Sequence, residues 1–398
     1  MTTASQVFGR ELAAWRAESR AALGLPADRA IVMTGHQAGI WHAGIAEKFV
    51  VGARHAAERG GVLVHVVVDH DLNDAALVAF PALVHGADGG GKLARLVLER
   101  APRGAGPNAL RKPVRTMRPE RAHEVPAEIE PALAAIERAI AAERGRENLA
   151  MQMAHAANAL LAPRARVDHT VAATAIAALP FAEALRAHFA PMREAYNAAV
   201  RGERIAPLAP GELPFWKLDR ATMSRSALME GDAADLVAPR ALTLTAIARL
   251  VLCDEFIHGT GGGRYDLSME RWITAAFGDD ARAALAPMSV VTATKLAPLA
   301  KHVPAFDAAA TPEVQRALEQ DPFNDDGATK RALRDAITGT RAEKRTAYLA
   351  MRRAIIDARA ARATELASLR TRIAANRDAI AAHALANDRT WPFPFAVR

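Results

Sequence analysis

The pattern of apolar and polar positions predicts an α/β protein. Residues 30–33 and 62–68 are short apolar runs, and the second is mostly valine, as expected of strands that are buried on both faces. A helix is expected between them over residues 43–59, ahead of Gly60 and Gly61. Strand, polar loop, helix and strand in this order predict a βαβ unit with a parallel strand pair.

Other stretches of the chain carry either a helical or a strand-like period. Helices are expected over residues 7–23, most of 129–200, 243–251 and 265–277. Strands are expected over residues 93–98, 215–218, 253–257 and 289–294. Residues 102–126 are rich in Pro, Arg and Gly and are expected to form a long connection.

The pattern changes from residue 325 to residue 386. Apolar residues there recur at spacings of three, four, seven or eleven, with charged residues between them. This spacing predicts an amphipathic helical arm, folded as an antiparallel hairpin near residues 338–340. A projecting coiled coil and an ordinary helical bundle packed on the core are both compatible with the pattern.

Length, cysteine content and charge narrow the class of protein. The chain has 398 residues, more than one compact core usually holds, so two or three structural units are expected. The single cysteine, Cys253, lies in an apolar stretch and supports neither a disulfide framework nor a zinc knuckle, which favours a reducing, cytoplasmic location. We expect no membrane span and no targeting segment, because the apolar runs are too short.

The formal net charge of +7 raises the question of nucleic-acid binding. Most arginines, however, are scattered singly through alanine-rich helices, and basic residues do not alternate with aromatic ones as stacking surfaces require. We therefore expect a small-molecule substrate, of anionic character, rather than a specific nucleic acid.

The first candidate segment for chemistry follows the strand predicted at residues 30–33. Ligands in open α/β sheets gather where loops leave the carboxyl ends of strands. The segment matches neither the GxGxxG dinucleotide motif nor the GxxxxGK[ST] phosphate loop, and a turn with capping polar groups is the alternative. The residues expected to bind substrate here are Thr34, Gly35, His36, Gln37 and His42.

The second candidate is the cluster Asp69, His70 and Asp71, at the end of the valine-rich strand. Three ionisable groups at such a place are costly unless they are paired or used. His70 between two carboxylates is a candidate general base, with its pKa raised by their charges. The cluster could instead hold a divalent metal together with His36 or His42, or it could be a hydrogen-bond cluster that only shapes the loop.

The third candidate is a glycine run, residues 261–263, placed ahead of the helix expected to begin at Tyr265. Backbone N–H groups of such a run form a cradle for phosphate or carboxylate, and a flexible hinge is the alternative. The residues expected to bind substrate around it are His258, Gly259, Thr260, Arg264 and Asp266. Further candidates to line the pocket stand at the end of the strand at 215–218 and after it, namely Lys217, Asp219, Arg220 and Arg225.

The segment Thr34-Gly35-His36-Gln37-Ala38-Gly39, followed one helix later by Val68-Asp69-His70-Asp71, resembles the bacillithiol-biosynthesis cysteine-adding enzymes. Those enzymes carry a TGQQxG loop after the first core strand and an EDHD motif at the end of the next. The resemblance covers residues 30–75. His36 stands where the family has its first glutamine, and Val68 where it has glutamate, which implies altered specificity or a different amine acceptor.

The resemblance implies a fold and a reaction. The fold is a Rossmann-like parallel-sheet core with helical inserts and a C-terminal coiled-coil arm that forms homodimers. The expected parts are the first part of the core (1–125), a mainly helical insert (126–210), the second part of the core (211–324) and the arm with its tail (325–398). The implied reaction is that of a carbon–nitrogen ligase, which joins the carboxyl of cysteine or another amino acid to an amine of amino-sugar type.

The resemblance also implies roles for residues. Thr34, Gly35 and Gln37 would shape the pocket, and Asp69, His70 and Asp71 would form its polar wall, with His70 taking up a proton. The sequence leaves open whether ATP or ADP takes part. Two alternatives remain: a metal-dependent hydrolase or phosphoesterase that uses the Asp-His-Asp cluster, and a non-catalytic binding protein that engages a partner through its helical arm.

Overall fold

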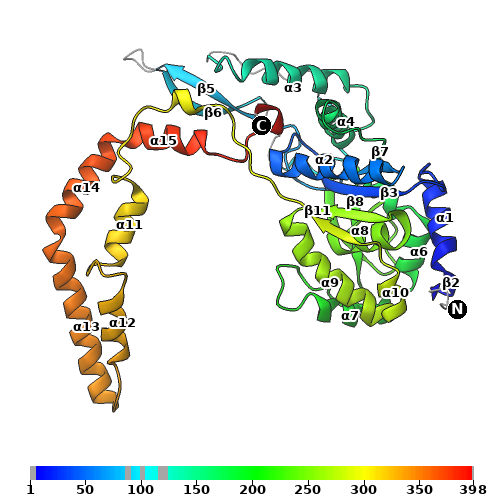
Figure 1. Ribbon diagram of the computed structural model, residues 1–398. Helices are drawn as coiled ribbons and strands as arrows, with labels where there is room; N and C mark the ends of the chain where they lie inside the picture. The colour runs from blue at the N-terminus through cyan, green and yellow to red at the C-terminus, as the bar shows by residue number, and fades with distance from the viewer. Residues whose placement is uncertain (1–5, 86–90, 99–103, 115–123, 397–398) are drawn as a thin grey trace. The chain divides into compact units, whose positions relative to one another are not determined.

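The computed structural model describes residues 6–85, 91–98, 104–114 and 124–396 (Figure 1). The chain forms two compact units. Unit 1 consists of Met1–Pro81, Arg95–Pro298 and Asp388–Arg398, and unit 2 of Ala82–Ala94 and Leu299–Asn387. Part of the long connection predicted over residues 102–126 lies outside the described residues. The four-part division predicted above stays a prediction.

A five-stranded parallel sheet forms the centre of unit 1. Its strands in spatial order are β12 (Met288–Val290), β11 (Glu255–His258), β3 (Ile31–Gln37), β4 (Val62–Val68) and β7 (His169–Ala172). All neighbouring pairs are parallel. The chain begins the sheet at β3, adds β4 and β7 on one side, and then returns to add β11 and β12 on the other. The strand order therefore reverses between β3 and β11, which is where open α/β sheets bind ligands.

The predicted βαβ unit is confirmed. Helix α2 (Ala43–Glu58) connects β3 to β4, and their parallel register runs from the pair Ile31 and Val62 to the pair Gln37 and Val68. Every residue of β4 except Val68 is buried, as its run of β-branched side chains requires for a strand covered on both faces. The α/β class is thus shown.

Unit 1 contains further helices, some of which contact the sheet and others of which pack on neighbouring helices. They are α1 (Leu12–Ala22), α3 (Glu130–Ala142), α4 (Leu149–Leu161), α5 (Ala173–Ala177), α6 (Pro180–Ala187), α7 (Arg193–Ala199), α8 (Ala241–Ile247), α9 (Thr260–Phe277) and α10 (Asp279–Ala283). Shorter helical turns are η1 (Ala190–Met192), the π-helical η2 (Ala248–Leu252) and η4 (Phe393–Phe395). No helix in the described parts of the chain is both long and apolar enough to cross a membrane.

The other described strands form smaller sheets. An antiparallel sheet has the order β10 (Leu236–Pro239), β8 (Glu212–Asp219) and β9 (Ser224–Met229), which confirms the strand expected at 215–218. Strands β1 (Gln6–Val7) and β2 (Arg10–Glu11) pair ahead of α1, and β5 (Ala79–His85) pairs with β6 (Gly91–Val97).

Several predicted boundaries were wrong. The strand expected to end at Met33 continues to Gln37, because each of its residues pairs with β4. The helix expected to begin at Tyr265 begins at Thr260, so the glycine run forms its first turn rather than a loop. The mostly helical stretch 129–200 also contains β7, which pairs with β4 at the edge of the sheet.

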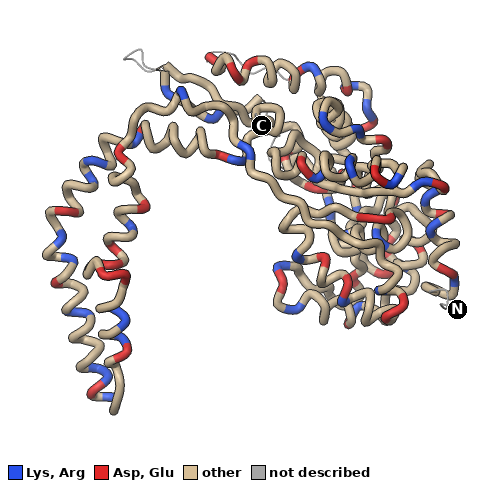
Figure 2. The backbone as a smooth tube through the Cα atoms, viewed as in Figure 1, with Lys and Arg blue, Asp and Glu red and all other residues tan. Residues whose placement is uncertain are grey.

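Unit 2 is mainly helical. Its helices are η3 (Ala300–His302), α11 (Pro312–Gln320), α12 (Ala328–Asp335), α13 (Arg341–Ala361), α14 (Ala363–Ala375) and α15 (Arg377–Ala386). The chain reverses between α12 and α13, close to the predicted turn, and Thr340 and Glu343 form a capping box at the start of α13. Acidic and basic residues are interspersed along these helices (Figure 2). That the arm is a coiled coil stays a prediction.

Candidate functional site

A cavity of about 570 Å³ lies at the carboxyl ends of β3, β4 and β11. Two of the predicted segments meet there, because Gln37 at the end of β3 donates a hydrogen bond from Nε2 to Oδ2 of Asp71, just after β4. His258, at the end of β11, lines the same cavity. The sequence thus placed these three polar segments at one edge of the sheet, and the structure brings them together.

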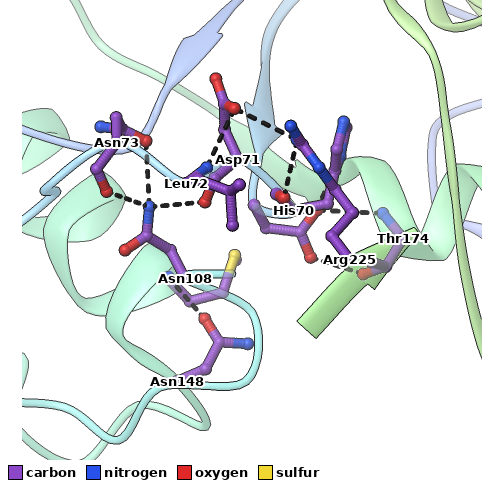
Figure 3. A network of polar contacts seen from close by, with 10 residues as sticks. His70, Asp71, Leu72, Asn73, Asn108, Asn148, Thr174 and Arg225 are labelled. Carbon is purple, nitrogen blue, oxygen red and sulfur yellow. Dashed lines mark hydrogen bonds and ion pairs between the residues drawn. The ribbon is translucent and has the colours of Figure 1, made fainter. Parts of the chain in front are cut away.

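Asp71, which lines this cavity, takes part in a network of polar contacts (Figure 3). Its carboxylate accepts hydrogen bonds from Gln37, from the Leu72 N–H at 2.9 Å and from Arg225 Nη1 at 3.2 Å. Burial alone raises the pKa of Asp71, but these hydrogen bonds and the Arg225 charge bring it below its ordinary value. Asp71 is therefore a carboxylate that fixes the Arg225 guanidinium, which also donates to the His70 carbonyl at 3.1 Å.

Asp69 has a structural partner rather than a cavity ligand. It is fully buried, and its carboxylate accepts from the Thr174 N–H at 3.1 Å and from Thr174 Oγ1 at 2.5 Å. Thr174 lies in the first turn of α5, so Asp69 stabilises the start of that helix. Its oxygen atoms are thereby occupied.

His70 is buried and lines the cavity, but it is not clamped between two carboxylates as expected. Its Nδ1 lies 3.8 Å from Asp69 Oδ1, and the Asp71 carboxylate is engaged by other donors. Among the described residues, Nδ1 of His70 has no hydrogen-bond partner. A buried imidazole nitrogen without a partner is unusual, and this one is itself shielded from solvent.

Three arginines give the cavity a cationic wall: Arg204, Arg225 and Arg240. The guanidinium carbons of Arg225 and Arg240 lie 4.6 Å and 4.1 Å from the centroid of the Trp216 ring. Arg240 also pairs with Glu212, which is almost fully buried. Planar guanidinium groups held in this way are suited to bidentate recognition of a carboxylate or phosphate.

Lys48 lies at the junction of β3 and β11, on the buried face of α2. It is only 4% exposed, and its Nζ donates to the Gly35 carbonyl at 2.6 Å. Burial lowers the pKa of the amine to about 7. Burial and then the Lys48 charge also lower the pKa of His36 to about 3, so this imidazole is neutral.

The other predicted residues of the first segment contact backbone atoms and stabilise the fold around the cavity. Gly35 is required by packing, since a Cβ added there would lie 2.8 Å from the Val66 carbonyl oxygen. Thr34 is fully buried and donates from Oγ1 to the Ile257 carbonyl at 2.9 Å, which ties β3 to β11. His42 caps α2, where its Nδ1 accepts from the Gly44 N–H at 3.1 Å.

Some residues of the third segment line a cavity, and others do not. His258 is buried, with Nε2 lying 3.3 Å from Oδ2 of the fully buried Asp266. Burial raises the pKa of Asp266, but His258 and Arg249 bring it below its ordinary value, and Arg249 Nη1 donates to it at 2.5 Å. Gly259 and Thr260 line a second, smaller cavity described below. Arg264 is exposed and lines neither cavity.

Sequence reasoning missed four residues of the site: Lys48, Arg204, Trp216 and Arg240. Only Lys48 carried a signal, because a lysine stands among the apolar positions of the predicted helix, between Ala46 and Phe49. Of the four further candidates at the end of the strand at 215–218 and after it, Arg225 lines the cavity.

The metal site that the sequence left open as an alternative gains no support from the described residues. Every carboxylate oxygen of Asp69 and Asp71 accepts a hydrogen bond from the protein. Over the ranges that the structure describes, no three His, Cys, Asp or Glu side chains are placed to hold one metal ion.

Comparison with known proteins gives no functional information, so any functional conclusion rests on the site itself. No protein-family model matches the chain, and no curated protein matches it either. The similarity to the cysteine-adding enzymes therefore rests on residues 34–39 and 68–71.

Proposed function

We propose that the chain is a ligase-like enzyme that joins an amino acid carboxyl to an amine of amino-sugar type in the larger cavity. One observation carries the proposal: a buried histidine, His70, has an unpaired ring nitrogen beside guanidinium groups held by Asp71 and Trp216. The cavity therefore combines an anchor for a carboxylate with a group that accepts a proton.

The chemistry of amide formation assigns these groups their roles. Arg240 and Arg204 bind the carboxylate-bearing substrate, and Arg225 is held in place by Asp71. The amine attacks the carboxyl carbon as a neutral nucleophile and becomes positively charged, and His70 takes up the proton it loses. Because joining the two groups formally releases water, we propose that the carboxyl is first activated by ATP as an acyl phosphate or acyl adenylate. The bond from the carboxyl carbon to phosphate or AMP then breaks as the amide bond forms, and phosphate or AMP leaves.

Three further parts belong to the same proposal. The strand order of the parallel sheet supports a Rossmann-like core. Exposed apolar side chains on α13, namely Tyr348, Leu349 and Ile356, support an arm that pairs as a coiled coil in a homodimer. The buried free thiol of Cys253 is compatible with a cytoplasmic location.

The test is a condensation assay on the purified full chain. The protein is incubated with ATP, magnesium, single amino acids and a panel of amino sugars, and products are detected by mass spectrometry as the sum of two substrates less one water. We expect the His70→Asn variant to lose about 100-fold or more in turnover with an unchanged thermal midpoint. The matched control is His155→Asn on α4, because His155 is half-buried and lines neither cavity.

Two results would overturn the proposal. Full turnover in the His70→Asn variant would reject the role of His70. Thermal shifts with amino acids or amino sugars, without any condensation product, would replace the ligase by a non-catalytic binding protein.

A further inference from the structure

A second cavity, of about 380 Å³, adjoins the first at the place where the strand order of the sheet reverses. The two cavities share four lining residues, Gly35, His36, His258 and Tyr265. The basic side chains that line the smaller cavity are those of His36, His42, Lys48, His258 and Arg389. None of its described lining residues is Asp or Glu. Asp266, next to His258, is fully buried and does not line it.

The start of helix α9 forms one wall of this cavity. Its N-cap residue, Gly259, has no side chain to cap the helix, and the first N–H groups of a helix have no acceptor within it. Thr260, Gly261 and Gly262 all line the cavity, and a helix of 18 residues adds the positive end of its dipole. This wall therefore offers several backbone donors to an anion.

Lys48 supplies an independent sign of a missing partner. An ammonium group has three N–H donors, and the Gly35 carbonyl accepts one of them. The side chain is 96% buried, since only 4% of it is exposed, and it lies beside the start of α9: a Cβ added at Gly259 would lie 3.9 Å from Lys48 Cδ. Lys48 lines this cavity together with other basic side chains, and a buried cation whose donors are not all satisfied is costly.

We propose that the smaller cavity binds a phosphate group, held by Lys48, Arg389 and the N–H groups at the start of α9. A phosphate dianion offers more acceptor oxygens and more charge than a carboxylate, which matches two cationic side chains and a helix N-terminus. The phosphate belongs to a phosphate ester, such as a sugar phosphate or a nucleotide, or is free inorganic phosphate. Because the cavities adjoin, the organic part of an ester extends past His36 into the larger one. This inference stands whether or not the chain is a ligase.

The experiment is isothermal titration calorimetry of the full chain at pH 7 with inorganic phosphate, glucosamine 6-phosphate and ATP. We expect at least one of them to bind, and a tenfold or greater loss of affinity in Lys48→Met and in Arg389→Met. Arg389 is exposed, so its replacement leaves the fold intact and tests the site independently of Lys48. Lys344→Met, an exposed lysine on α13, is the matched control and should bind as the wild type does.

The three ligands identify the source of the phosphate. Tighter binding of the sugar phosphate or of ATP than of inorganic phosphate supports the proposal and assigns the ester. Equal binding of all three supports a site for the phosphate group alone. Failure of all three to bind at 10 mM, or binding that neither variant weakens, would overturn it. Phosphate binding that both variants weaken, without condensation, would reject the ligase alone. Condensation together with phosphate binding that neither variant weakens would reject this inference alone.

Discussion

Lys48 should make unit 1 less stable at low pH than at high pH, and its replacement by Met should remove that trend. Burial lowers the pKa of the Lys48 amine from its ordinary value of 10.5 to about 7 in the folded chain. Between these two values the unfolded chain binds a proton that the folded chain does not. Stability therefore rises with pH across this window, and the full penalty is present below pH 7.

The size of the effect follows from the two pKa values. Each pH unit between them corresponds to about 1.4 kcal/mol. The Lys48 amine therefore lowers the free energy of unfolding by about 5 kcal/mol at pH 6 and by about 2 kcal/mol at pH 9. Met has a similar length but cannot donate to the Gly35 carbonyl, which costs about 1 kcal/mol at either pH. We expect Lys48→Met to be more stable than the wild type at pH 6, and this advantage to shrink by about 3 kcal/mol at pH 9.

Urea denaturation followed by tryptophan fluorescence measures this difference. All five tryptophans lie in unit 1, so their fluorescence reports on the unit that holds Lys48. Comparing variant and wild type at each pH cancels the titrating groups that the Lys48 charge does not reach, and Lys344→Met controls for the loss of a lysine charge. A stability difference that is the same at pH 6 and pH 9 would refute the reasoning, because it would mean that Lys48 keeps its ordinary pKa.

Three further predictions follow from the same contacts. Sulfate, which does not titrate near neutrality, should bind about 20-fold more weakly at pH 8.5 than at pH 6.5, because Lys48 loses its proton over this range. The side chains of His36, His42, His258 and Arg389 line the same cavity, so the pH dependence is compared with that of Lys48→Arg, which keeps its charge. An equal pH dependence in that variant would contradict the assignment to Lys48. Gly35→Ala should lower the free energy of unfolding, measured in urea, by about 1–3 kcal/mol, because the added Cβ would clash with the Val66 carbonyl. Gly145→Ala is the control, since Gly145 has open space around it and its replacement should not destabilise the fold. Equal stability of the two variants would show that β3 and β4 separate easily. Asp69→Asn should cost about 1–3 kcal/mol, because its amide places a donor against those of Thr174, and an unchanged urea midpoint would contradict a structural role for Asp69.

The part of the fold predicted from the sequence is the part where local pattern and tertiary environment agree. The valine run of β4 is continuous because both of its faces are covered, and Gly60 and Gly61 end α2 where expected. Strand β7 has only four residues and is set by its pairing with β4, which the local sequence does not encode. Helix α9 begins through three glycines against their low helix propensity, so packing decides its start.

The candidate site divides in the same way. Its polar segments after β3, β4 and β11 were predictable because parallel strands present their carboxyl ends at one edge of a sheet. The cationic wall was not, because Trp216 lies on β8, Arg225 on β9 and Arg240 just after β10, in a separate antiparallel sheet. No periodicity indicates which face of that sheet meets the strand ends. Arginines in an arginine-rich chain also give no signal that separates them from surface residues.

The buried ionisable groups of unit 1 differ in whether other residues of the protein satisfy their hydrogen bonds. Asp69 is fully buried, and both of its carboxylate oxygens accept hydrogen bonds from Thr174, so removing Asp69 would leave those donors unsatisfied. Lys48 and His70 are each 4% exposed, but they keep a donor or a ring nitrogen that the described residues do not satisfy. A fold selected for stability alone would replace both with apolar side chains. Both line cavities at the carboxyl edge of the same sheet, so a bound molecule is the partner that would offset their burial.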